Sequence, residues 1–443
     1  MVVAAGKWDH LLMRAAVLAC VLAAACGRGA PPSTGAPDGA IGTQPDAGVA
    51  PLDAGTPDGG APDAGPVLHD GVLLGISGAR YQSGATRGIT DAAGGFRWEE
   101  GAKVSFFAGG LLLAEVAPAP LLTPFALAGS CAAGPQLRKL LVLLATVGSG
   151  LGSLDPSLLA GESLAAVDLS QALAVLAPGV APVAEADALD AFIRTVDSEQ
   201  WVEDSREVWS GADAEQRTQG VAWDGAGWLF SWELGLSRTD ASYNVITRAT
   251  AAIPAALYLQ YGTNHIGDID FLDQTLYVPL EDHPAYAHPR VGFYDAQTLS
   301  FRSSVGLDPA LQPDGVPWVA QWNGQLVTSP WNPAPVLNLF AMDGSFLRSI
   351  ALRPTLNRIQ GAKVSGDMMY AARDGDPKTV LKIVLETGTA IQLFTLPDVG
   401  EQEGIAVAGG MLHTEDVAPD KVHIELRHHR KTQDSIRDQV CAQ

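Results

Sequence analysis

The chain contains few basic residues and none of the common catalytic motifs. Its 443 residues include 28 Lys and Arg against 49 Asp and Glu, which gives a formal net charge of −21. Binding to a phosphate backbone requires clustered positive charge, so this balance argues against a nucleic-acid partner. No Gly-x-Ser-x-Gly elbow, phosphate-binding loop, dinucleotide fingerprint or His-Glu-x-x-His motif occurs in the sequence. Function must therefore be inferred from architecture and from side chains that converge in space.

Cysteine is also scarce. The four cysteines are Cys20, Cys26, Cys131 and Cys441, and no CxxC or Cys/His spacing typical of a zinc site occurs among them. The first two lie in the apolar leader described below. Cys131 and Cys441 therefore have two possible states, a disulfide in an oxidising compartment or two free thiols.

Residues 1–26 are predicted to be a lipoprotein signal peptide. A basic start is followed by a run of apolar and small residues that is too short for a permanent membrane-spanning helix. The stretch Leu-Ala-Ala-Ala-Cys-Gly that ends at Gly27 resembles the lipobox of bacterial lipoproteins, although Ala23 stands where Leu is usual. The resemblance implies lipid attachment to Cys26 and an outer-membrane location, either periplasmic or at the cell surface. Lipidation at Cys20 and an ordinary cleaved signal peptide are the alternatives.

Three further segments are predicted before the repeats. Residues 27–66 are mainly Pro, Asp, Ala, Gly and Thr, so they cannot bury enough apolar surface to fold and are predicted to be a disordered tether. Residues 67–130 alternate short apolar runs with Gly-rich turns, which predicts a small β-domain. Its phrase Thr-Asp-Ala-Ala-Gly-Gly-Phe, from Thr90, resembles a turn of carboxypeptidase-regulatory-like and related immunoglobulin-like modules, which implies a structural or adhesive sandwich-like domain. Residues 131–199 have apolar residues at helical spacing and predict a short helical bridge.

A phrase built around one glycine recurs five times between residues 219 and 430. Each glycine begins a short apolar run that is followed by a polar turn and a second apolar run, and a further hairpin comes later in the unit. Four strands in such a unit are typical of a β-propeller blade. The sequence therefore predicts a mainly β protein whose residues 200–431 form a five-bladed propeller, with a β-sandwich of short strands as the alternative. The glycines, spaced 43 to 48 residues apart, are Gly220, Gly267, Gly315, Gly361 and Gly404.

The fifth unit lacks a fourth strand of its own. It has a third strand at 422–426 and then becomes polar and basic. Residues 200–209 contain two strand-like runs with nothing else to pair with. We therefore expect this segment to close the ring by supplying the missing outer strand, and a sixth, degenerate blade is the alternative. Residues 432–443 are predicted to be a polar C-terminal tail.

Residues beside the repeat glycines are expected to converge on one mouth of a central channel, because inner strands line that channel. Convergent oxygens at Asp268, Asp314 and Glu403 would suit a hard cation such as calcium. The phrases that begin at Gln219 and Glu403 resemble those of gluconolactonase and strictosidine-synthase-like propellers. Many of these propellers hold a metal that polarises a lactone or ester carbonyl, although Gln219 replaces a Glu of their pattern and no clear sixth repeat is present.

The candidate catalytic residues are His265, His283 and Glu403. His283 lies in a stretch, 281–289, with two histidines and two carboxylates that could bind metal or transfer protons. A solvated loop held by two prolines is the alternative interpretation, and it also applies to a similar polar run that begins at His413.

Two functions are compatible with these features. The first is a surface-anchored binding protein that is held to the membrane by its lipid and presents the propeller to an extracellular glycan or peptide. Trp318 and Trp331 would supply aromatic platforms for that ligand, unless they serve only blade packing. The second is a calcium-dependent hydrolase of lactones or phosphoesters that uses Glu403, Asp268 and His265. Calcium is the one candidate cofactor.

Overall fold

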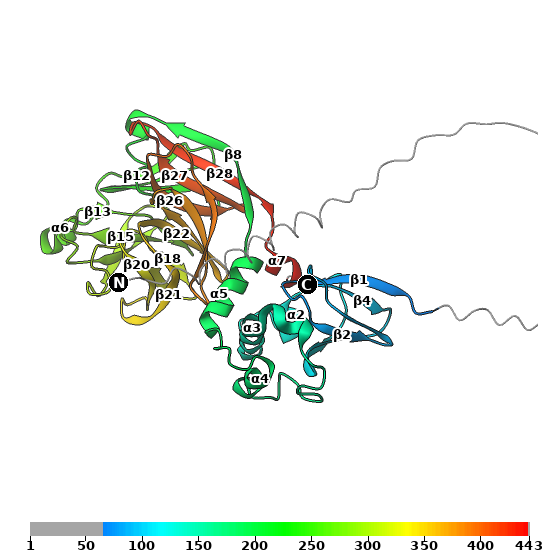
Figure 1. The fold of residues 1–443 in the computed structure, drawn as a ribbon. Helices are drawn as coiled ribbons and strands as arrows, with labels where there is room; N and C mark the ends of the chain where they lie inside the picture. The colour runs from blue at the N-terminus through cyan, green and yellow to red at the C-terminus, as the bar shows by residue number, and fades with distance from the viewer. Residues whose placement is uncertain (1–64, 442–443) are drawn as a thin grey trace, which may run out of the picture. The chain divides into compact units, whose positions relative to one another are not determined.

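The computed structural model describes residues 65–441, which form two compact units, 65–188 and 189–441 (Figure 1). The protein is mainly β, with 44% strand and 16% helix, so the predicted class is confirmed. The predicted signal peptide, the lipidation site Cys26 and nearly all of the tether lie outside the described residues. Within the described part, no helix combines the length and apolarity that a membrane span requires.

The first unit contains two small sheets. Their strand orders are β4-β1-β7 and β3-β2-β5-β6. Thr90 and Asp91 organise the predicted turn, because the Asp91 carboxylate accepts backbone N–H bonds from Ala93 and Gly95 at 2.8 and 2.7 Å. The Thr90 hydroxyl also accepts from the backbone N–H of Ala79. The strands are Leu68–Leu73 (β1), Arg80–Ser83 (β2), Thr86–Ile89 (β3), Gly95–Glu99 (β4), Val104–Ala108 (β5), Leu111–Val116 (β6) and Leu121–Leu122 (β7).

Helices follow these sheets, as the change of apolar period predicts. A proline begins each of the first two, where the missing N–H costs no helical hydrogen bond. Leu137, Leu140 and Leu141 of the predicted stripe are buried, so the stripe is core. The helical elements are Pro124–Ala128 (α2), Pro135–Val147 (α3), Gly148–Ser153 (η1, a 3-10 helix), Leu169–Leu176 (α4) and Glu185–Val196 (α5). Cys131 and Cys441 are both disulfide-bonded, so neither is a free thiol.

The second unit is built from five groups of antiparallel strands. Two groups are separate sheets, β12-β11-β10-β9 and β13-β15-β16-β17, and in the latter β14 also pairs with β15. The next two groups join into one nearly closed eight-stranded sheet, in the order β18-β19-β20-β21-β25-β24-β23-β22. The last group is β26-β27-β28-β8.

The strands of the second unit have the following bounds. They are Gln200–Trp209 (β8), Gly220–Trp223 (β9), Trp228–Trp232 (β10), Gly235–Thr239 (β11), Val245–Ala249 (β12), His265–Ile266 (β13), Asp270–Leu272 (β14), Thr275–Glu281 (β15), Arg290–Asp295 (β16), Phe301–Gly306 (β17), Ala320–Trp322 (β18), Gln325–Thr328 (β19), Ala334–Phe340 (β20), Phe346–Leu356 (β21), Ile359–Ser365 (β22), Met368–Arg373 (β23), Thr379–Val384 (β24), Thr389–Thr395 (β25), Glu401–Ala408 (β26), Met411–Val417 (β27) and Ile424–Gln433 (β28). Its helical elements are Gly211–Asp213 (η2, a 3-10 helix), Ala255–Tyr261 (α6) and Ile436–Cys441 (α7).

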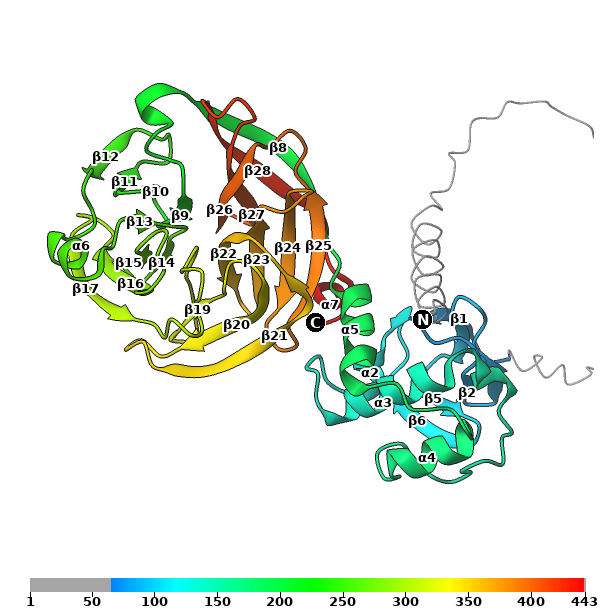
Figure 2. The same cartoon turned by 60° about the vertical axis from the view of Figure 1, so that its left-hand side comes forward.

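The repeat glycines bring the innermost strands together. Strands β9, β14, β18, β22 and β26 contact one another in that order, and β26 contacts β9 again. Figure 2 labels β9, β14, β22 and β26 of this series. A Cβ atom on Gly220 would lie 2.4 Å from the Cα of Asp268, and one on Gly404 would lie 2.8 Å from the Cα of Gly220. Because real Cβ atoms do not approach backbone this closely, only glycine allows these strands to meet.

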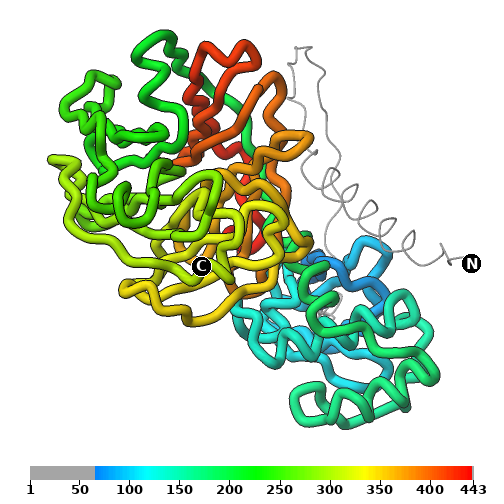
Figure 3. Tube along the Cα trace, turned by 90° about the vertical axis from the view of Figure 1, so that its left-hand side faces the viewer, coloured from blue at the N-terminus to red at the C-terminus, as the bar shows by residue number. Residues whose placement is uncertain are grey.

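Strand β8 pairs along the whole of β28, from Ile424 opposite Trp209 to Gln433 opposite Gln200. The expected role of residues 200–209 as the outer strand of the last group is confirmed, and Figure 3 shows this green segment beside the red C-terminal one. Strand β28 runs further than its predicted end at residue 426. Its polar residues Arg427, His428 and His429 are buried and have polar partners, so they extend the strand instead of ending it.

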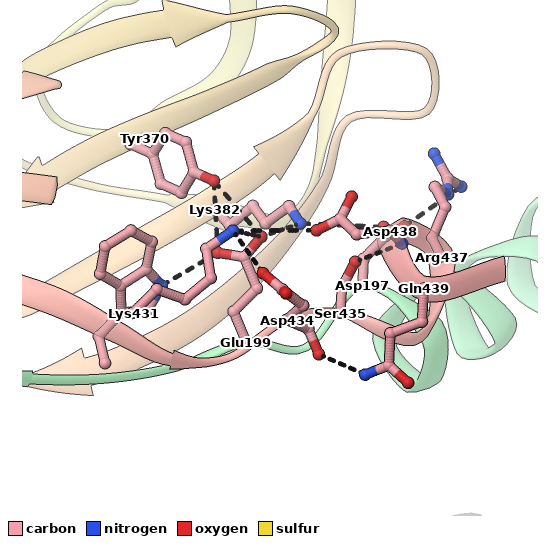
Figure 4. A network of polar contacts seen from close by, with 11 residues as sticks. Asp197, Glu199, Tyr370, Lys382, Lys431, Asp434, Ser435, Arg437, Asp438 and Gln439 are labelled. Carbon is pink, nitrogen blue, oxygen red and sulfur yellow. Dashed lines mark hydrogen bonds and ion pairs between the residues drawn. The ribbon is translucent and has the colours of Figure 1, made fainter. Parts of the chain in front are cut away.

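A buried ionic network ties the C-terminal segment to this closure (Figure 4). Lys382 is 1% exposed, and its Nζ lies 2.6 Å from a carboxylate oxygen of Glu199. Asp197 is fully buried and lies 3.2 Å from Arg437 of α7. The predicted polar tail therefore contains a short helix that is anchored by a buried ion pair.

Candidate functional site

The centre of the second unit is occupied by an ion pair. The carboxylate of Asp268 is fully buried and lies 2.5 Å from the Nζ of Lys363, and it also accepts backbone N–H bonds from Val221 and Ala362. Burial raises the pKa of Asp268 to about 7, against the opposing effect of the Lys363 charge. Asp268 therefore connects three different strand groups through its hydrogen bonds, and its negative charge is balanced by that of Lys363.

Further carboxyl groups surround this pair. Glu403 accepts a hydrogen bond from Gln360 at 3.2 Å, and Glu415 has no hydrogen-bond partner for either oxygen among the described residues. Burial raises the pKa of both glutamates well above the usual value, with smaller contributions from neighbouring carboxylates. These groups therefore favour their protonated, neutral forms inside the protein.

The predicted metal ligands have separate partners. Asp268 pairs with Lys363 and Glu403 bonds to Gln360, whereas Asp314 accepts the backbone N–H groups of Trp331 and Asn332 at 2.9 and 2.5 Å. In residues 65–441 no group of three or more His, Cys, Asp or Glu side chains is arranged to hold a metal ion. Calcium at Asp268, Asp314 and Glu403 stays a prediction.

One face of the second unit carries three of the candidate site residues. In an antiparallel group, the connections after the second and fourth strands leave from the end at which the first strand begins. We call this face, formed by residues 282–289, 307–317, 329–333, 357–358 and 374–378, the loop face. It holds His283, Asp314 and Trp331, and the neighbouring His265 begins β13, the first strand of its group.

His265 and Glu281 form a pair at the edge of the loop face. The Nδ1 atom of His265 is buried and lies 2.8 Å from Oε1 of Glu281, and the other carboxylate oxygen accepts the backbone N–H of Val316 at 2.8 Å. The Nδ1–H bond would not point directly at this oxygen, so the contact is not a well-aligned hydrogen bond. Nδ1 nevertheless carries the proton, because the lone pairs of an unprotonated nitrogen and a carboxylate oxygen would repel each other at this distance. The remaining nitrogen, Nε2, is then left as a free acceptor.

His283 lies next to His265. Their ring centroids are 6.0 Å apart, and the ring of Tyr286 lies 5.5 Å from that of His283. The side-chain amide of Asn264 bonds to both the backbone N–H and the carbonyl of residue 283, at 2.8 Å each. Two of the three predicted catalytic residues are thus brought together, whereas Glu403 lies beside Gln360 in the centre.

The two predicted ligand-binding tryptophans have different environments. Trp318 is fully buried and belongs to a hydrophobic core cluster, so its ring has no face open to a ligand. Trp331 is half-buried on the loop face, and the guanidinium of Arg358 lies 5.4 Å from its ring centroid. Arg358 and Lys378 both pair with the buried carboxylate of Asp374. Trp331 therefore remains the candidate aromatic platform.

The polar run at His413 is a buried strand. Nε2–H of His413 donates to the carbonyl of Ala408 at 3.2 Å, so its Nδ1 must accept the bond from Nδ1–H of His428 at 2.6 Å. Nε2 of His428 then accepts from the hydroxyl of Tyr243 at 3.2 Å. This chain of bonds requires His413 to be neutral. Burial lowers the pKa of His413 to about 4, and it also lowers the pKa of His428.

Two functional partners were missed by sequence reasoning. Glu281 was noted only as one member of a polar loop, although it orients His265. Lys363 was not singled out, although it was detectable as a charged residue within an apolar inner-strand run, where a buried charge requires a partner.

Comparisons with known proteins do not assign the chain to a family. No protein-family model matches the chain, and no curated protein matches it. A solved structure of a protein of unknown function from Bacteroides caccae is similar to 49% of this chain and 82% of its own, with 13% identity and a TM-score of 0.30.

Proposed function

We propose that the second unit is a five-bladed β-propeller that binds an extracellular glycan or peptide on its loop face. The five strand groups and the closed order of contacts among their first strands support the propeller. In this proposal, the N-terminal lipid at Cys26 anchors the protein to the outer membrane and the first unit is a structural, immunoglobulin-like module.

The observation that carries the proposal is the half-buried Trp331 beside Arg358. The backbone carbonyl of Trp331 accepts the backbone N–H of Arg358 at 2.6 Å, and Asp314 holds the N–H groups of the same loop. An aromatic ring held in place offers a stacking surface at a low entropic cost, and a planar guanidinium beside it adds hydrogen-bond donors. Such a pair suits a sugar ring or a peptide side chain.

The geometry favours binding over the predicted hydrolase. The three proposed hydrolase residues, Glu403, Asp268 and His265, are engaged with three different partners. A ligand site needs only a few fixed polar groups around an apolar surface, which the loop face provides.

Glycan-array and peptide-library screening of the full chain, followed by calorimetric titration of any ligand found, tests the proposal. We expect Trp331→Ala to weaken binding at least tenfold while the thermal unfolding midpoint stays within a few degrees. Trp322→Ala is the matched control, because Trp322 also packs beside an arginine, Arg348 at 5.9 Å, but lies at the opposite end of the β18–β19 hairpin. Equal loss of binding in both variants, or none in Trp331→Ala, would refute the proposed face.

A further inference from the structure

We propose that His265 and His283 form a binding site for a divalent transition-metal ion on the loop face. This inference is separate from the glycan or peptide ligand and does not rest on it. It also differs from the predicted calcium site, which would use oxygen ligands at other residues.

The first support is the orientation of His265. Its Nδ1 atom faces Glu281, whose other oxygen is fixed by the backbone N–H of Val316. Metal-binding histidines usually have a carboxylate or a carbonyl beside their second ring nitrogen, which fixes the tautomer and directs the free lone pair at the ion. At His265 the carboxylate is in place at 2.8 Å, although the N–H does not point along a hydrogen bond. The side chain of His265 is 22% exposed although Nδ1 is buried, so the exposed part of the ring lies away from Glu281.

The second support is the distance between the two rings. A zinc–imidazole bond is about 2.1 Å long, so the ring centroid lies about 3.2 Å from the ion; two rings on one ion are about 5.2 Å apart at a tetrahedral angle and at most about 6.4 Å apart when they are opposed. The observed separation between the His265 and His283 centroids, 6.0 Å, is within this limit. His283 is exposed, so its ring can rotate to direct a nitrogen at the same ion.

The third support is the rigidity of the surrounding backbone. Asn264, the residue before His265, clamps the backbone of His283 with two hydrogen bonds. Gly315, at φ +96°, allows Glu281 and Tyr286 to approach, since a Cβ there would lie 2.1 Å from the Glu281 carboxylate and 2.7 Å from the Tyr286 ring. The two imidazoles are therefore held near each other without the ion.

The ligand set indicates the kind of metal. Neutral imidazole nitrogen suits copper, nickel and zinc, whereas calcium and magnesium prefer oxygen. Two protein nitrogens leave the other coordination positions to water or to an incoming ligand. Such an open site is consistent with the absence of a third His, Cys, Asp or Glu ligand among residues 65–441.

Titration of the full chain with copper(II) chloride tests the inference, read by calorimetry and by electron paramagnetic resonance. We expect one ion per protein with splitting from two nitrogen ligands. His265→Ala and His283→Ala should each weaken binding at least tenfold and leave a one-nitrogen signal. Glu281→Gln should keep both nitrogens but weaken binding about tenfold or more, because the orienting carboxylate is lost.

His288→Ala provides the control on the same loop. His288 is exposed and pairs with Asp282 at 3.0 Å, away from the proposed ion, so its removal should leave both signals unchanged. Thermal unfolding without metal verifies that each variant is folded. If His265→Ala does not fold, the test rests on His283→Ala, because His283 is exposed and its loss should not affect folding. The inference is overturned if wild type binds no copper, or if His283→Ala retains wild-type affinity and the two-nitrogen signal.

Discussion

Acidification should weaken the second unit through His413, and the size of the effect can be worked from its environment. The imidazole has an ordinary pKa of 6.5, and burial lowers it to about 4 in the folded protein. Protonation would also place two N–H groups against each other at the 2.6 Å contact with His428. The stabilisation is therefore complete above pH 6.5 and is lost as the pH falls from 6.5 towards 4, because the unfolded chain binds the proton more readily.

The gap of about 2.5 pH units corresponds to about 3.4 kcal/mol at the acid end, of which about 2 kcal/mol is already lost at pH 5. Buried carboxyls oppose this trend: burial raises the pKa of Asp268 and Asp416 to about 7, so their protonation on acidification favours the folded state. The wild-type pH profile alone is thus not diagnostic. The test is the difference between wild type and His413→Asn, a side chain that keeps an acceptor facing His428 but does not titrate.

Urea unfolding followed by tryptophan fluorescence measures this difference, because Trp228 packs against His413 with ring centroids 4.8 Å apart. We expect His413→Asn to be less stable than wild type at pH 7, and this deficit to shrink by about 2 kcal/mol at pH 5. His69→Asn, at an exposed histidine of the first unit, should show no such change. A deficit that is equal at the two pH values would refute the reasoning.

Two further predictions concern the centre of the second unit. Lys363→Met should destabilise it by about 3–5 kcal/mol, because the buried carboxyl of Asp268 would lose its partner, and the double variant Lys363→Met/Asp268→Asn should recover part of that loss. Denaturant unfolding of the four proteins measures the coupling, and additive losses would contradict a direct ion pair. Gly404→Ala should lower stability by more than about 2 kcal/mol, since its Cβ would meet the Cα of Gly220 at 2.8 Å. Gly134→Ala, with nothing within 4 Å, is the control, and similar losses in both variants would count against the close approach.

The backbone arrangement was predictable to the extent that it depends on local pattern. The repeat glycines were visible because close approach of the inner strands admits no other residue at Gly220 and Gly404. The pairing of β8 with β28 was predictable because 200–209 is strand-like and had no other partner. Strand patterns thus carried most of the information on architecture.

Polar burial was not predictable in the same way. The run from His413 to Asp416 has the composition of a solvated loop, but it lies within β27 because Arg427 and His428 of β28 supply its partners. Asp268 and Lys363 are 95 residues apart, and no local pattern indicates that their side chains meet. Long-range pairing decides whether a polar residue is buried, so sequence reasoning identified His265 and His283 but not the contact between them.

The polar centre and the loop face should therefore contribute to different properties. At the centre, the charge of Asp268 is balanced by Lys363, and burial raises the pKa of Glu403 and Glu415 so that they favour their neutral forms. Little net charge is left there to attract a ligand. Substitution of one of these side chains mainly leaves another buried polar group without a partner. Side chains on the loop face, such as His283 and Trp331, are exposed or half-buried and contribute less to the core. Substitutions at the centre should lower stability, whereas substitutions at the loop face should lower binding at nearly constant stability.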